Sequence, residues 1–211
     1  MEDIIATQVE IINLALGHIA QAPISATSEA SIAAETAARV WDTARKEALS
    51  GHDWAFGTVV ATLTPSSNFA TLTASGTYAG DWSYAYTYPG NCLALWKVYN
   101  ESKANKSISD DFRVLHDATN SQKVIVSNTP SALGEYTFDL ADPTFYDARF
   151  VSVLSYRLAA AMAMPLTGDP NLGITMMKIF NDMMGEAERM SALENNPDKV
   201  NEGTSAFVDA R

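Results

Sequence analysis

The sequence predicts an α+β fold: a bundle of about four helices from the two chain ends, with an inserted small antiparallel β domain. Residues 1–56 and 142–194 carry apolar side chains at helical spacing, whereas residues 57–141 carry short β-branched and aromatic runs separated by turn residues. Each helical end presents an apolar stripe that needs a partner, so the two ends are expected to cover one another. Residues 195–211 are polar and are predicted to form an extended C-terminal tail.

The first chain end predicts two helices. Thr7 and Glu10 have the spacing of a capping box, and an apolar stripe follows them. The second helix is predicted to begin after Thr27 or Ser28. Its stripe is mostly alanine, which lets another backbone approach closely, and its one large side chain is that of Trp41. The two helices are predicted to form an antiparallel hairpin.

The middle of the chain predicts about five or six short strands in a small antiparallel sheet or sandwich. Between residues 82 and 88 aromatic and small residues alternate, so the aromatic side chains share one face of a strand. A Pro-Gly-Asn turn then leads into a returning strand. The strands are expected at residues 57–63, 82–88, 93–99, 112–116, 123–126 and 135–140. The side chains expected to anchor the core are Trp41, Trp54, Phe56, Trp82, Tyr84 and Tyr86.

The second chain end predicts two more helices, because Asp142-Pro143 and Asp169-Pro170 each combine a capping acid with a proline suited to the first helical position. All seven methionines after Met1 lie between residues 162 and 190. Methionine fills cores and also repacks against irregular partners, so both a core and an interface remain open interpretations. The candidate interface residues are Met176, Met183, Met190, Phe207 and Arg211.

Composition narrows the classes of function. The chain has 14 basic and 25 acidic residues, and its net charge of −11 repels phosphate, which argues against affinity for DNA or RNA. Its single cysteine, Cys92, excludes a disulfide within the chain and a zinc site built from thiolates alone. The longest apolar run, residues 158–166, is shorter than the roughly 20 residues of a membrane span. We therefore expect a soluble protein with no membrane partner.

No catalytic, metal or cofactor motif is present in the sequence. The three histidines, His18, His52 and His116, are far apart in the chain, and no metal or cofactor is expected. Scattered carboxylates such as Asp110-Asp111, or Asp139 with Asp142, leave a cell-wall hydrolase as one alternative. A second alternative is a β-sheet carbohydrate-binding module that uses the aromatic strand face. We nevertheless expect a protein that is not an enzyme.

Several segments resemble a known family when they are taken in order. They read IINLALGHI at residues 11–19, RKEAL at 45–49, HDWAF at 52–56, WSYAYTYPGNCL at 82–93 and MPLT at 164–167, followed by the acidic, methionine-rich helix. This ordered set resembles the tail tubular protein A family, the head-to-tail adaptors of short-tailed bacteriophages. The resemblance spans roughly residues 5–56, 82–98 and 142–194. One departure is Asn91, where the family often has aspartate.

The resemblance implies a structural protein of the virion tail, assembled in the host cytoplasm and without catalytic residues. Such adaptors form a ring, typically of twelve copies, below the portal protein. They extend the DNA channel and dock the tail nozzle protein, while the free protein can be a monomer. Twelve copies of this chain would carry about −130 charges, so phage DNA would pass through without specific binding.

Overall fold

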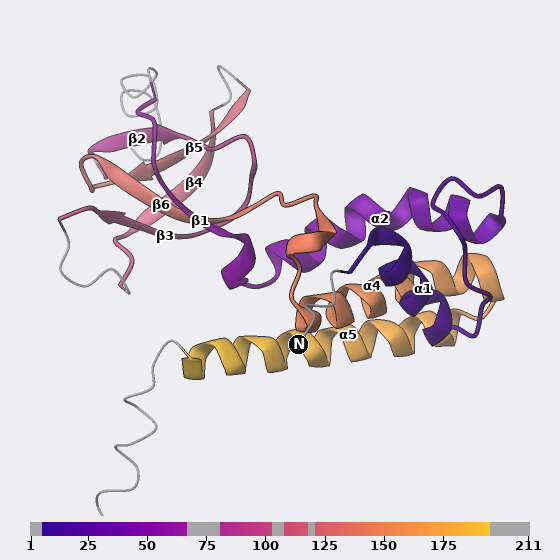
Figure 1. The fold of residues 1–211 in the computed structure, drawn as a ribbon. Coiled ribbons are helices and arrows are strands. Elements are labelled where there is room, and N and C mark those ends of the chain that lie inside the picture. The colour runs from indigo at the N-terminus through magenta and orange to yellow at the C-terminus, as the bar shows by residue number, and fades with distance from the viewer. Residues whose placement is uncertain (1–5, 67–80, 103–107, 118–120, 195–211) are drawn as a thin grey trace, which may run out of the picture. The chain divides into compact units, whose positions relative to one another are not determined.

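The structure is a computed structural model that describes residues 6–66, 81–102, 108–117 and 121–194. Within these residues it has four α-helices and two antiparallel sheets of three strands each, which confirms the predicted α+β class. The chain divides into two compact units, which are visible in Figure 1. Met1–His52 and Ala141–Arg211 make the helical unit, and Asp53–Leu140 makes the β unit.

The helical unit is organised around one helix. Its elements are α1 (Gln8–His18), α2 (Ile32–Ser50), α4 (Ala148–Thr167) and α5 (Pro170–Glu194). α4 packs against each of the other three helices. The fully buried side chains of α4 include Phe150, Leu154, Leu158 and Met162. α4 is therefore the core of this unit, and the other helices cover it.

The central position of α4 explains its composition. Within the described part of the chain, it is the one helix long and apolar enough to match a membrane span, and 44% of that span is buried inside the protein. Contacts with three neighbouring helices account for this apolar character. Pro165 lies in the last turn of α4, and Gly168 then ends the helix with a φ of 71°. This left-handed conformation suits glycine and turns the chain into α5.

The predicted hairpin of α1 and α2 is wrong, because the two helices pack against α4 instead. The segment between them, residues 19–31, is long enough to separate them. The side chain of Asn13 fixes this segment by donating to Ile24 O at 3.0 Å and accepting from Ile24 N at 2.8 Å. An apolar stripe shows which face of a helix is buried, but it does not identify the partner.

Two predicted helix starts also differ from the structure. α2 begins later than Thr27 or Ser28, at the cap residue Ser31, because Glu29 accepts hydrogen bonds from the preceding turn. Asp142-Pro143 begins only the short 3-10 helix η2 (Pro143–Phe145). α4 starts after Asp147, whose carboxylate accepts from the Phe150 amide at 2.6 Å.

The β unit begins with the 3-10 helix η1 (Ala55–Gly57) and contains two sheets. One has the strand order β1-β6-β3 and the other has the order β2-β5-β4. All neighbouring strands are antiparallel, and each predicted strand overlaps an observed one. The strands are β1 (Thr58–Thr62), β2 (Tyr84–Thr87), β3 (Cys92–Asn100), β4 (Phe112–Asp117), β5 (Gln122–Ser127) and β6 (Ala132–Phe138).

Main-chain hydrogen bonds join the two sheets at two corners. The chain leaves β1 and pairs next with β2, because Thr64 O accepts from Thr87 N and Ser66 N donates to Ala85 O, each at 2.8 Å. At the other corner, Val98 of β3 bonds the segment that leads into β4. The β unit is thus a sandwich in which one continuous segment, residues 58–66, serves both sheets.

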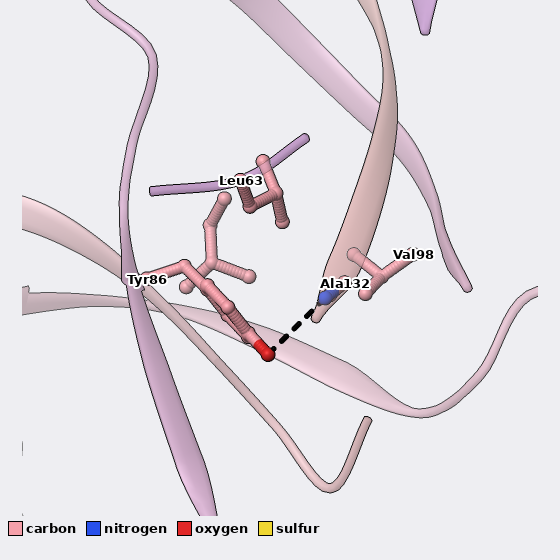
Figure 2. Packing of buried hydrophobic residues seen from close by; sticks show 5 residues of the cluster. Leu63, Tyr86, Val98 and Ala132 are labelled. Atoms are coloured by element: carbon pink, nitrogen blue, oxygen red, sulfur yellow. Dashed lines mark hydrogen bonds between the residues drawn. The ribbon is translucent and has the colours of Figure 1, made fainter. Parts of the chain in front are cut away.

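A small apolar cluster fills the space between the sheets. Its fully buried members are Leu63, Tyr86, Val98, Ile125 and Ala132. Figure 2 shows that the Tyr86 ring reaches across this cluster and that its hydroxyl meets the main chain at the start of β6. The hydroxyl donates to Thr129 O at 2.5 Å and accepts from Ala132 N at 3.3 Å. A polar atom is therefore satisfied inside the core.

Candidate functional site

The histidines do not form a shared site. His18 and His52 belong to the helical unit, and His116 lies in β4 of the β unit. No group of three or more His, Cys, Asp or Glu side chains suited to a metal ion occurs in residues 6–66, 81–102, 108–117 and 121–194. The predicted segment His52-Asp53-Trp54 leads from α2 into η1, and His52 and Trp54 are both buried.

One histidine makes a contact that the sequence did not indicate. His18 Nε2 lies 3.0 Å from the hydroxyl of Ser155, and the ring stacks on Tyr156 with the ring centroids 4.0 Å apart. A serine–histidine contact can activate a nucleophile. Here, however, Ser155 is only 1% exposed and its hydroxyl donates to Ser152 O at 2.7 Å. The ring therefore donates to Ser155, and the pair joins α1 to α4.

The environment of Cys92 keeps its thiol protonated. Burial raises the pKa of Cys92 and also raises the pKa of the neighbouring Tyr88 hydroxyl. Lys123 Nζ lies 5.2 Å from the centroid of the Tyr88 ring, and its positive charge lowers the pKa of Cys92, but the effect of burial is larger. A protonated, half-buried thiol is a poor nucleophile.

Two of the carboxylates predicted as possible catalytic acids, Asp110 and Asp142, have structural partners. Asp110 and Asp111 line an open polar pocket of about 470 Å³ in the β unit, but Asp110 Oδ2 accepts from the Thr129 hydroxyl at 2.8 Å and so fixes the adjacent loop. Asp142 caps η2 and accepts from the amide and hydroxyl of Thr144. These hydrogen bonds lower the pKa of Asp142. Both arrangements hold turns in place.

The aromatic row of residues 82–88 does not present a common exposed face. Tyr86 is 2% exposed, whereas Trp82 and Tyr88 are half-buried. Tyr84 is 40% exposed, which differs from its predicted role as a core anchor. It is the first residue of β2, where the sheet ends, and less of the protein covers it. A single exposed ring is a weak platform for carbohydrate stacking.

The other predicted anchors occupy interior or partly interior positions. Trp41 of α2 is 7% exposed, and Trp54 is 3% exposed. Phe56 is half-buried, with its ring centroid 5.9 Å from that of Trp54. Trp41 faces the helical core, whereas Trp54 and Phe56 begin the β unit.

The predicted methionine interface separates into buried and exposed positions. Met176 is buried in the helical unit, and Met183 is half-buried, so both contribute to packing α5. Met190 is 38% exposed and remains a candidate contact. Phe207 and Arg211 lie outside the described residues.

Other apolar side chains of the helical unit are more exposed than these methionines. Ile32 is 75% exposed, Ile174 is 68% exposed and Met164 is 57% exposed. Ile32 begins α2, while Met164 and Ile174 flank the turn at Gly168, and Figure 1 shows these helix ends at the same end of the helical unit. α4 and α5 form a helical hairpin whose turn lies at Gly168. We refer to Ile32, Met164 and Ile174 as the hairpin-end residues, after the end of the helical unit at which this turn lies. Single exposed apolar side chains are common, and they indicate a contact surface only where they gather in one region, so the shared helix end makes these three a candidate.

Comparison with known proteins adds no family assignment. No protein-family model matches the chain, and no curated protein matches it.

Proposed function

We propose that this protein is a bacteriophage head-to-tail adaptor, which forms a ring below the portal, extends the DNA channel and docks the next tail component. The observation that carries the proposal is the ordered set of segments resembling the tail tubular protein A family. These segments correspond to α1, the end of α2, β2 with the start of β3, and the end of α4. They therefore involve both units of the chain.

Surface chemistry supports a role in assembly. The hairpin-end residues place three large apolar side chains in solvent, and such side chains gain free energy when a partner covers them. The polar pocket and the histidine contact have structural explanations, so neither requires a substrate. The net charge of −11 suits a conduit that does not hold DNA.

Electron microscopy of the purified chain, alone and mixed with the portal protein encoded in the same genome, tests this function. We expect rings of the chain coaxial with the portal and enclosing a continuous channel. Absence of any complex with the portal contradicts the proposal. In a parallel gel-shift measurement, duplex DNA should not bind the free chain at physiological salt.

A pair of matched variants tests the hairpin end. Ile174→Asp should weaken assembly on the portal, because it puts a charge into a contact that would be apolar. Ile108→Asp is the control, since Ile108 is also exposed, at 58%, but belongs to the β unit. Equal assembly by both variants means that the hairpin end makes no contact.

A further inference from the structure

The segment of residues 58–66 forms one edge of the sandwich. Its main-chain groups on the side away from β6 are hydrogen-bonded to β2 at Thr64 and Ser66, but they are unpaired among the described residues along β1. Successive residues of a strand direct their main-chain groups alternately to either side. Leu63 N bonds Ala132 O of β6 at 2.8 Å, and the neighbouring Thr64 O points the other way and accepts from β2. By the same alternation, Thr58, Val60 and Thr62 direct their main-chain groups away from β6.

Within residues 6–66, 81–102, 108–117 and 121–194, no strand pairs with these outward groups. Among the described residues, β1 pairs with β6 alone, and Val60 and Thr62 make no main-chain hydrogen bond on the outer side. The corresponding edge of β2 is bonded by Thr64 and Ser66, and that of β3 is bonded in part by Ser109. As far as the described residues go, the edge of β1 therefore lacks the hydrogen-bonded cover that those two edges have.

The side chains of β1 also lack the usual protection of an edge strand. Val59 is 36% exposed and Val60 is 52% exposed, although they point to opposite faces of the sheet. The strand reads Thr-Val-Val-Ala-Thr and contains no charge, proline or glycine. Edge strands of proteins that remain unpaired usually carry charges, prolines or bulges that prevent pairing. β1 has none of these.

We propose that β1 is a pairing edge for a second copy of this chain, in which two β1 strands run antiparallel with Val60 opposite Val60. The strand is nearly symmetric about that residue. In this register Thr58 faces the partner's Thr62. The outward N–H and C=O groups of Thr58, Val60 and Thr62 then form hydrogen bonds with the same groups of the partner strand. Val59 faces the partner's Ala61, which covers a side chain that the single copy leaves exposed. The pair joins two three-stranded sheets into one continuous sheet.

This contact is isologous and closes on itself. It describes the free protein, and it does not depend on the adaptor function. A failure of the pairing would leave portal binding unaffected, so the two proposals are rejected by different results.

Sedimentation velocity of the full chain over a concentration series tests the pairing. The unaltered protein should form dimers. Val60→Lys and Val60→Glu should each raise the dimer dissociation constant by about tenfold or more, because like charges then lie opposite one another. An equimolar mixture of the two variants should recover the dimer, since the proposed register places the lysine opposite the glutamate.

Two control variants distinguish a specific loss of dimer formation at β1 from a general effect of the substitution on folding. Val60→Thr keeps an uncharged β-branched side chain and should keep the dimer. Val114→Lys introduces the same charge at an exposed valine of β4, 42% exposed, and should also keep it. A monomer at every concentration, an unchanged dimer in Val60→Lys and Val60→Glu, or no dimer in their mixture overturns the proposal. Circular dichroism confirms that each variant is folded.

Discussion

The two units of this protein build their cores in different ways. The helical core is mostly apolar packing around α4, apart from the buried Ser155 hydroxyl that contacts His18, and the face of α2 turned toward it is a seam of small residues, including Ala34, Ala37, Ala44 and Ala48. The β core is smaller and has a hydroxyl group within it, because Tyr86 bonds main-chain atoms on the far side of the cluster. The comparison teaches that shape complementarity specifies one unit, whereas a hydrogen-bonded tyrosine helps to specify the other.

The largest expected change in stability comes from removing the large aromatic side chain in the alanine seam of the helical core. Trp41→Ala should lower the free energy of unfolding by about 3–5 kcal/mol, because the neighbouring seam residues Ala37 and Ala44 are too small to fill the space that the indole leaves. Chemical denaturation followed by circular dichroism measures it. A near-neutral result would mean that Trp41 does not contribute to the core.

The next effect tests the polar element of the β core. Tyr86→Phe keeps the ring but leaves Thr129 O without its donor and Ala132 N without its acceptor. The expected loss is about 1–3 kcal/mol in the free energy of unfolding. Tyr84→Phe is the matched control on the same strand, where the ring is exposed, and it should change stability by less than about 0.5 kcal/mol. Equal losses in the two variants would contradict a special role for the buried hydroxyl.

The smallest effect concerns the polar contact between α1 and α4. Burial lowers the pKa of His18, so the folded state favours the neutral ring. The unfolded chain then binds a proton first as the pH falls through about 6.5, and stability should decline from there toward the lower pKa of the folded state. His18→Gln should flatten this part of the profile in denaturation measurements. Glu10 and Asp142 also have lowered pKa values, but they titrate in a more acidic range.

Local signals made much of the fold predictable. The capping box at Thr7, the turn after β2 and the buried face of α2 all depend on neighbouring residues, and all are observed. The pairing of helices was not predictable, because one apolar stripe fits several partners. Hydrogen bonds of the Asn13 and Glu29 side chains fix the conformation of the segment between α1 and α2. The spacing of residues in the sequence does not predict the main-chain groups that they bond.

The candidate sites were less predictable for the same reason. The contact of His18 with Ser155 joins residues 137 positions apart, and no motif marks it. Alternation correctly put Tyr86 inside, but it could not show that the sheet ends at Tyr84. Methionine content left both a core and a contact surface open, whereas the most exposed large apolar side chains of α2 and of the described part of α5 are isoleucines near the helix starts.

The passage of residues 58–66 from one sheet to the other has a consequence for how the β unit opens. Because one uninterrupted segment bonds β6 through residues 58–63 and β2 through Thr64 and Ser66, the two sheets cannot move apart at this corner unless one of these sets of main-chain hydrogen bonds breaks. Amide hydrogens deep in β5 and in β6 should therefore exchange with solvent through one shared, cooperative event.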